Sequence, residues 1–193
     1  MALRVQGLAG PDRLADALCV TVDEARARVS ALSEAGIVEE RTGRLAGYTL
    51  TLAGNATLDE ALTEEGLRGD EELTDAYQRF LVLNKRLLET CSAWQVRSHG
   101  SIEEPNDHSD PDYDNDVIER LGSLHDRTTA LLRKVSERAP RFDAYCARLG
   151  SCVDRLREGD RRAFTAPMAE SYHTVWFELH QDLLLTLGLE REE

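Results

Sequence analysis

The 193-residue chain is short of positive charge. Lys and Arg together number 23 against 36 Asp and Glu, which leaves a formal net charge of −13. This balance argues against a general nucleic-acid coat protein and against binding to an anionic membrane surface, because both depend on excess cations. No window approaches the roughly eighteen apolar residues of a membrane span, and the N-terminus has no basic-then-apolar signal pattern. We therefore expect a cytoplasmic protein with no membrane partner.

Catalytic and metal-binding signatures are also missing. The chain contains no dinucleotide- or phosphate-binding glycine motif, no nucleophile elbow and no H-E-x-x-H pair. Its four cysteines show no C-x-x-C spacing, so we expect mostly reduced, buried thiols. Cys19 is the candidate if a thiol switch exists. These absences predict a protein that is not an enzyme and that carries no cofactor.

The most informative stretch runs from Pro11 to Gly54. Thr21 followed by Glu24 is a capping box, which marks a helix start, and Gly36 suits the left-handed residue after a helix end. Two apolar runs then flank a glycine-containing loop over 41–47, a hairpin signal. The order helix, turn, helix, hairpin predicts a winged helix-turn-helix. The apolar positions that support the two helices and the hairpin are Leu14, Ala15, Leu18, Val22, Ala25, Val29, Leu32, Ile37, Val38, Tyr48 and Leu50.

These residues, together with the closing run Leu50-Thr51-Leu52-Ala53-Gly54, resemble the DNA-binding half of MarR-type transcriptional regulators. The resemblance covers about a quarter of the chain. It implies that the helix starting near Thr21 enters the major groove of double-stranded DNA and that the 41–47 loop is a wing touching the backbone. The residues that it implies for DNA contact are Thr21, Arg26 and Arg28 on the helix, and Arg41 and Arg44 on the wing.

Charge leaves a second interpretation of this module open. Residues 1–54 hold six Arg against seven Asp or Glu, a local net charge of −1. Affinity for DNA comes largely from cations that neutralise phosphates, so such a module binds a duplex weakly unless two copies act together. The alternative is a winged helix that contacts a partner protein, in an adaptor or in a regulatory subunit of a metabolic phosphotransfer enzyme.

From Asp70 onward the apolar pattern is helical. The glycines at 66 and 69 predict a boundary between a domain over 1–66 and a second domain over 70–193. Four amphipathic helices are expected, over about 70–94, 113–138, 140–158 and 168–187, which favours a mainly α fold ending in a helical bundle. Such a bundle would sense a small-molecule effector, form a homodimer or bind a partner. The acidic segment Pro105–Asp116 lacks EF-hand spacing, so we expect a solvated loop that caps the next helix.

Polar residues interrupt the apolar seams of the expected bundle. His173 and His180 are two helical turns apart, and His125 lies on another seam. Three interpretations stay open: a metal site, a pocket for a small polar or anionic ligand, and hydrogen-bonded core residues that fix helix register. The separation of the two histidines, about 10 Å along the axis, disfavours a shared metal ion, and no metal is predicted. The pocket candidates are Asn84, Trp94, Arg97, His108, His125, Tyr172, His173, Trp176 and His180.

Two further resemblances concern the second half. The plan of a winged helix followed by an acidic helical domain is similar to GntR-type regulators, whose helical sensor domains bind metal and carboxylates. The elements Trp94-Gln95, Pro105–His108 and Ser171–His173 look like a bacterial helical domain that accompanies phosphotransfer enzymes using phosphoenolpyruvate. The sequence thus predicts a ligand-responsive transcriptional regulator, with the protein-binding adaptor as its alternative.

Overall fold

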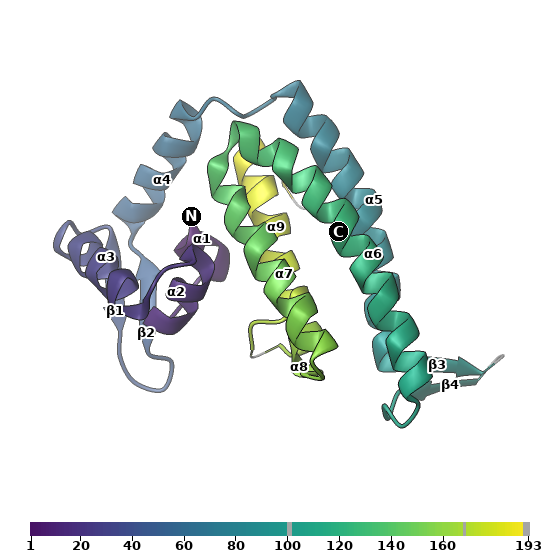
Figure 1. Cartoon of the computed structure of the whole chain (residues 1–193). Coiled ribbons are helices and arrows are strands. Elements are labelled where there is room, and N and C mark those ends of the chain that lie inside the picture. Colours follow the sequence, from purple (N-terminus) through teal and green to yellow (C-terminus); the bar gives the residue numbers. More distant parts are fainter. Residues whose placement is uncertain (100–101, 168, 191–193) are drawn as a thin grey trace. The chain divides into compact units, whose positions relative to one another are not determined.

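The computed structural model of the chain describes residues 1–99, 102–167 and 169–190, and most of them are helical. The chain divides into two compact units (Figure 1). Unit 1 comprises Met1–Leu73 and the described part of Phe177–Glu193, and unit 2 comprises Thr74–Trp176. Among the described residues, no helix combines the length and the apolar character needed to cross a bilayer.

The N-terminal part of unit 1 has the element order expected from the sequence. Pro11 opens the second helix, a position that suits its fixed backbone and missing N–H. The capping box is confirmed: the Glu24 amide donates to Thr21 Oγ1 at 3.3 Å, and the Thr21 amide donates to Glu24 Oε2 at 2.9 Å. Gly36 has a left-handed φ of 71° just after that helix. The elements are α1 (Ala2–Gln6), α2 (Pro11–Leu18), α3 (Val22–Glu34), β1 (Val38–Arg41), β2 (Gly47–Leu50) and α4 (Leu52–Glu64).

A two-stranded hairpin closes the core of this part. β1 and β2 pair antiparallel from Val38 opposite Leu50 to Arg41 opposite Gly47. Ala9 adds a single bridge to the outer side of β2, since its amide and carbonyl both bond to Tyr48 at 3.1 and 2.8 Å. The buried side chains between the helices and the hairpin are Leu3, Ala9, Leu14, Ala15, Ala25, Val29 and Val38.

The run after β2 differs from the expectation. We interpreted Leu50–Gly54 as the closing run of the hairpin, but α4 begins within it, at Leu52. Thr51 causes the early start, because its hydroxyl accepts the Gly54 amide at 3.0 Å and so caps the helix. The same hydroxyl donates to the carbonyl of Gly36 at 2.7 Å, which ties the start of α4 to the end of α3.

Unit 2 is built from long helices and contains one hairpin that the sequence did not reveal. β3 and β4 pair antiparallel and end at Pro105, where the segment that we expected to be a solvated loop begins. Residues 106–110 of that segment lie outside helices and strands, and residues 111–116 already belong to the next helix. The expected capping role is confirmed in that Asp110 caps the next helix, accepting the amides of Asp112 and Tyr113 at 3.2 Å. The elements are α5 (Glu71–Gln95), β3 (Val96–His99), β4 (Ile102–Pro105), α6 (Pro111–Arg138), η1 (Pro140–Phe142), α7 (Asp143–Arg157) and α8 (Arg162–Thr165).

The last helix, α9 (Tyr172–Leu187), contributes residues to both units. In unit 1 its Glu178 is buried and bonds to two N-terminal side chains: Gln6 Nε2 donates to Glu178 Oε1 at 3.0 Å, and Arg13 lies 3.4 Å from the same oxygen. A buried carboxylate needs such partners, because an unpaired charge away from water is costly. Glu178 therefore fixes the second half of α9 against α1 and α2.

Two glycines in helices should respond to alanine in opposite ways. At Gly54, in the first turn of α4, a Cβ would overlap the Ile37 carbonyl oxygen, which already accepts the Thr51 amide. At Gly150, within α7, the nearest atom would lie 3.8 Å away, an ordinary contact. We expect Gly54→Ala to destabilise the protein by about 1–3 kcal/mol through overpacking. Gly150→Ala should be neutral or stabilising by up to about 1 kcal/mol, from helix propensity alone.

Urea unfolding followed by far-UV circular dichroism measures both changes. Gly150→Ala serves as the matched control, since it adds the same methyl group to a helical glycine. A Gly54→Ala protein as stable as the unmodified chain would contradict the close approach of α4 to the end of α3.

Candidate functional site

Helix α3 presents a broad free surface in unit 1. Only Ala25 and Val29 are buried along its length, and they face the core beneath the hairpin. Arg26 and Arg28 are exposed. Thr21 is exposed too, but both its amide and its hydroxyl bond to Glu24, so its side chain serves the cap first.

The four arginines proposed for DNA contact differ in their partners. Arg26 lies 3.4 Å from Asp23, and Arg41 lies 2.6 Å from Glu39. No ion pair in the part of the chain that the structure describes involves Arg28, on α3, or Arg44, in the loop between β1 and β2. Two of the four cations are thus available without breaking an ion pair.

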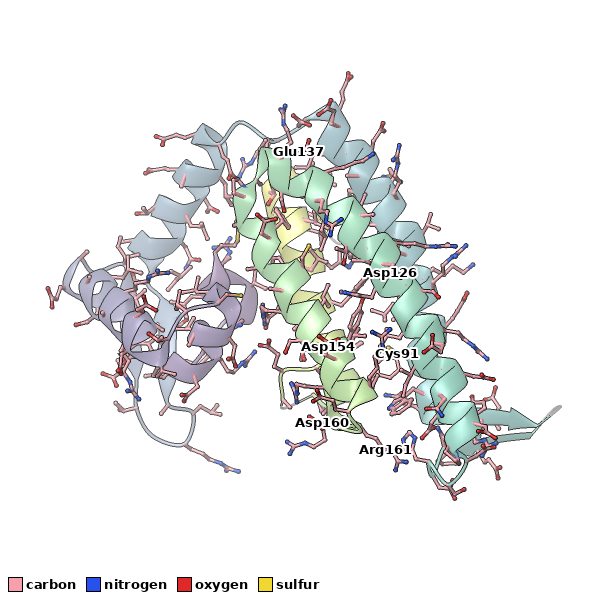
Figure 2. The ribbon with its side chains drawn as sticks, viewed as in Figure 1. Cys91, Asp126, Glu137, Asp154, Asp160 and Arg161 are labelled. Carbon is pink, nitrogen blue, oxygen red and sulfur yellow. The ribbon has the colours of Figure 1, made fainter. Side chains whose placement is uncertain are left out.

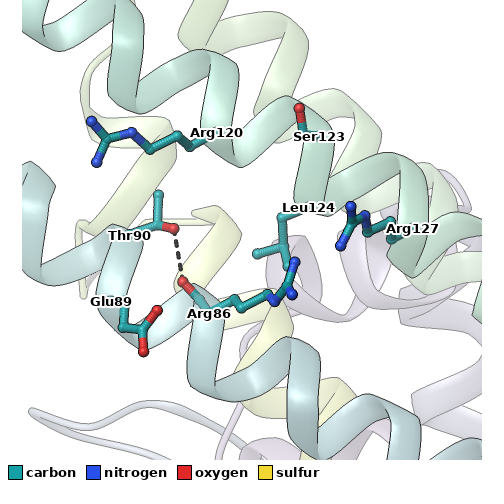
Figure 3. A pocket seen from close by; sticks show the side chains of 7 residues that line it. All are labelled: Arg86, Glu89, Thr90, Arg120, Ser123, Leu124 and Arg127. Carbon is teal, nitrogen blue, oxygen red and sulfur yellow. Dashed lines mark hydrogen bonds between the residues drawn. The ribbon is translucent and has the colours of Figure 1, made fainter.

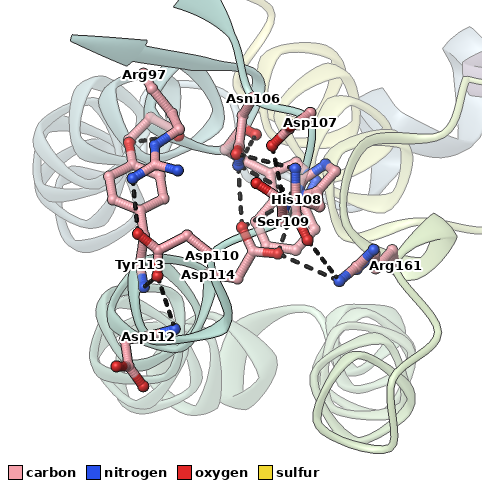
Figure 4. A network of polar contacts seen from close by, with 12 residues as sticks. Arg97, Asn106, Asp107, His108, Ser109, Asp110, Asp112, Tyr113, Asp114 and Arg161 are labelled. Carbon is pink, nitrogen blue, oxygen red and sulfur yellow. Dashed lines mark hydrogen bonds and ion pairs between the residues drawn. The ribbon is translucent and has the colours of Figure 1, made fainter. Parts of the chain in front are cut away.

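A buried carboxylate organises the loop before α6 in unit 2 (Figure 4). Asp114 accepts the side-chain amide of Asn106 at 3.0 Å, and both its oxygens lie 3.0 Å from His108 Nδ1. Because a carboxylate only accepts, a neutral His108 ring carries its proton on Nδ1. Arg161 completes the group, 3.6 Å from Asp114 and donating to the His108 carbonyl at 3.1 Å.

The same loop is held against the end of α5. Asn106 donates to the Trp94 carbonyl at 3.0 Å, and the rings of Trp94 and His108 lie 4.4 Å apart. His108 adopts a left-handed φ of 59°, which is uncommon for a residue with a side chain. A hollow of about 250 Å³ adjoins this group, with Trp94, Asp114 and Arg161 among its lining residues.

Arg97 lies beside this group and has two partners. Its guanidinium bonds to Asp110 at 2.8 Å and sits 4.6 Å from the centre of the Tyr113 ring. The hydrogen bond from the Tyr113 amide, the ion pair with Arg97 and the bond from the Asp112 amide lower the pKa of Asp110. Trp94, Arg97 and His108, three of the predicted pocket residues, thus lie around one loop.

Four other predicted pocket residues form a second chain of contacts inside unit 2. The Trp176 indole donates to Asn84 Oδ1 at 2.8 Å, and its ring lies 6.0 Å from that of Tyr172. Tyr172 in turn meets His125 edge-on at 6.1 Å. Burial raises the pKa of Tyr172, which therefore stays protonated. The bond between Trp176 and Asn84 suits hydrogen-bonded core residues, one of the three interpretations drawn from the sequence. Tyr172 and His125 meet by ring contact instead, and the Tyr172 hydroxyl and His125 Nδ1 are buried without a hydrogen-bond partner in the described chain.

The histidines of α9 have different environments. His173 is exposed, whereas His180 is buried on the part of the helix that belongs to unit 1. Across the described residues, no three His, Cys, Asp or Glu side chains are grouped so that they could hold a metal ion. The ligand pocket inferred from the sequence stays a prediction.

Sequence reasoning did not select Asn106, Asp114 or Arg161, which carry most of the bonds around the α6 loop. The sequence had drawn attention to that loop only through the acidic segment Pro105–Asp116 and the run Pro105–His108 within it. No known protein family, curated protein or solved structure matches this chain. Its function is therefore argued from its own residues.

His125 should make stability depend on pH. Burial lowers its pKa below the ordinary 6.5; Asp126 and Asp154 (Figure 2) oppose the shift, and Arg157 reinforces it. The unfolded chain then binds a proton at His125 more readily than the folded chain does. The free energy of unfolding therefore falls as the pH drops from 6.5 through the lower pKa that His125 has in the folded protein.

We expect His125→Gln to reduce the loss of unfolding free energy between neutral and mildly acidic pH. Urea unfolding at several pH values measures it, and His173→Gln is the control, since that ring is exposed on α9. An unchanged pH dependence in His125→Gln would show that this ring does not carry the effect.

Proposed function

We propose that the first part of unit 1 is a winged helix-turn-helix of the MarR type and that the protein is a DNA-binding transcriptional regulator. In this proposal α3 is the recognition helix and the loop between β1 and β2 is the wing. The helical region over 70–193 forms a bundle that senses a small molecule or assembles two copies. The observation that carries the proposal is the exposed outer surface of α3 beside a paired hairpin.

The dimensions of α3 suit a major groove. Its 13 residues span about 20 Å, and a groove about 12 Å wide admits one helix. Arg28 and Arg44 can contact DNA phosphates without first breaking an ion pair. The pairs formed by Arg26 and Arg41 are exposed, and such pairs contribute at most about 1 kcal/mol, so a DNA phosphate can replace the carboxylate.

The small number of cations favours a dimer on DNA. Four arginines from one copy neutralise few phosphates, and the affinity from phosphate contacts rises with their number. Two copies related by a twofold axis would double that number and would favour a palindromic duplex. A helical unit that brings two copies together is the economical source of such a dimer.

Loss of Arg26 and Arg28 tests the proposal. A duplex selected from a random pool should bind in a salt-dependent manner, and Arg26→Ala with Arg28→Ala should abolish the binding. Any residual binding should have a salt slope smaller by about one for each phosphate that an arginine no longer neutralises. Fluorescence anisotropy over a salt series measures both quantities.

The control replaces Lys85 and Arg133 by alanine, which removes the same charge from exposed positions of unit 2. Duplex affinity that the α3 changes leave untouched would exclude α3 as the reading helix. Equal losses of affinity in both double variants would indicate attraction to overall charge.

Exposed leucines favour a second candidate, an adaptor or regulatory subunit that uses this module to contact a partner protein. Leu32 on α3 is 41% exposed, Leu45 in the wing loop 73%, and Leu52 at the start of α4 90%. Apolar side chains contribute little to phosphate contacts but much to protein interfaces. The ion pairs of Arg26 and Arg41 also make the surface less positive than a DNA reader needs.

The adaptor predicts a stable complex with one enzyme, of which a phosphotransfer enzyme is the kind suggested by the sequence. The tagged protein, purified from its own cells, should carry that enzyme, and Leu32→Glu with Leu45→Glu should release it. Glu34→Gln, a change on the same helix that removes a charge and leaves the leucines in place, is the control. A monodisperse protein that binds a specific duplex and no enzyme would exclude the adaptor.

A further inference from the structure

Helices α5 and α6 run side by side in unit 2 (Figure 1). Side chains of both helices line an open hollow between them (Figure 3). Its volume is about 500 Å³, within the range of small-molecule sites. Three arginines and a single acid line it, which is unusual in a chain with a net charge of −13. The lining residues are Arg86, Glu89, Thr90, Arg120, Ser123, Leu124 and Arg127.

The three arginines have no carboxylate partner. No ion pair among residues 1–99, 102–167 and 169–190 includes Arg86, Arg120 or Arg127, and Glu89 is unpaired as well. Some other arginines of this unit are bonded to acids, among them Arg148 to Glu170 at 3.1 Å and Arg155 to Asp160 at 2.5 Å.

Clustered like charges repel one another, and here no ion pair within the described chain offsets the repulsion; Glu89 is the single acid among the lining residues. Acidic residues outnumber basic ones by 13, so carboxylates are abundant elsewhere in the sequence. A positive hollow in a low-dielectric wall attracts small anions from solution. The missing negative charge is therefore best supplied by a ligand.

Two of the three arginines extend toward each other, and Arg120 lies farther along the hollow (Figure 3). Arg120 and Arg127 are seven residues apart, which places them on one face of α6 about 10 Å apart along its axis. Arg86 faces them from α5, and Figure 3 shows Arg86 and Arg127 extending into the space between the two helices. The buried side chains of Leu124 and Thr90 form the bottom of the hollow. The Thr90 hydroxyl is already used, because it donates to the Arg86 carbonyl at 2.8 Å. The guanidinium groups are thus the main polar groups that a ligand would meet.

We propose that this hollow binds a small phosphorylated molecule. A carboxylate has one charge and two oxygens, which one arginine satisfies in bidentate fashion. A phosphate monoester has a charge of about −1.5 to −2 and three acceptor oxygens, so it can accept hydrogen bonds from both Arg86 and Arg127, which extend toward each other. Glu89, which also lines the hollow, would repel a second anionic group of the ligand. A ligand hydroxyl suits that position instead, because it can donate to the carboxylate.

A neighbouring hollow provides room for the organic part of the ligand. It has a volume of about 360 Å³, shares Arg127 with the first hollow and is mostly apolar. Val82 in its wall is 59% exposed, so its side chain would gain from being covered. The remaining lining residues are Arg79, Leu83, Ala130, Leu131 and Lys134.

This assignment goes beyond DNA binding and does not depend on it, because all the residues involved lie in unit 2. Calorimetric titration with phenyl phosphate tests it. We expect saturable binding of one molecule per chain, tighter than that of inorganic phosphate, which lacks the apolar ring. Arg86→Gln and Arg127→Gln should each weaken it about tenfold or more, as expected for loss of a charge-assisted hydrogen bond.

Lys85→Gln is the matched control, since Lys85 neighbours Arg86 in α5, is exposed and does not line the hollow. Its affinity for phenyl phosphate should equal that of the unmodified protein. Circular dichroism and urea unfolding should show that all three variants fold normally.

Four results would overturn the assignment. They are the absence of saturable binding, equal weakening by Lys85→Gln, binding of citrate as tight as that of phenyl phosphate, and loss of duplex binding in Arg86→Gln or Arg127→Gln. The last would make the hollow a contact for DNA phosphates. Phenyl phosphate binding in the Arg26→Ala, Arg28→Ala protein separates this site from the proposed DNA surface, because it should be unchanged there.

Discussion

The pairing of arginines with carboxylates determines which parts of this acidic protein can meet an anion. Several of the cations discussed above have a carboxylate at hand, as Arg97 and Arg148 have in unit 2. A paired guanidinium is largely neutralised, and only exposed pairs can be exchanged for a phosphate at small cost. The cations without an ion pair in the described chain include Arg28 and Arg44 in unit 1 and the three arginines that line the hollow between α5 and α6 in unit 2, and these are the surfaces for which binding is proposed.

Burial of carboxylates sets a second constraint, because each must be met by donors. Asp114 is met by Asn106, His108 and Arg161, which come from the loop before α6 and from the segment before α8. These bonds and the tilted contact between the His108 and Trp94 rings hold the loop in place, and they maintain the left-handed backbone of His108. The network accounts for a fixed loop in a polar, Asp-rich stretch that would otherwise be solvated.

Local signals in the sequence were sufficient for the elements of the N-terminal part. The capping box at Thr21, the proline at position 11 and the left-handed glycine at 36 each act within a few residues, so they can be read without knowing the fold. Thr51 shows the limit of such reading, since a cap directly after a strand looks like a continuation of that strand. The hairpin of β3 and β4 was missed because its strands are short and polar.

The candidate sites were harder to predict, because they depend on contacts between distant segments. His173 and His180 share a face of α9 by spacing, yet one is exposed and the other buried, since the helix passes from unit 2 to unit 1 between them. Arg120 and Arg127 have the seven-residue spacing of a single face, a signal that was present in the sequence. What that spacing does not reveal is that Arg86 lies opposite and that no carboxylate of the described chain neutralises the three.

The helices shared by the two units bear on how the proposed sites would communicate. α5 begins in unit 1 and continues into unit 2, where it forms one wall of the arginine-lined hollow, and α9 contributes to both units. A ligand in the hollow changes the affinity of α3 for DNA only if the ligand binds two states of the protein with different affinities. Bound DNA must then change the affinity of the protein for the ligand by the same factor. α5 is one covalent connection between the units, since its first three residues, 71–73, belong to unit 1 and the remainder to unit 2.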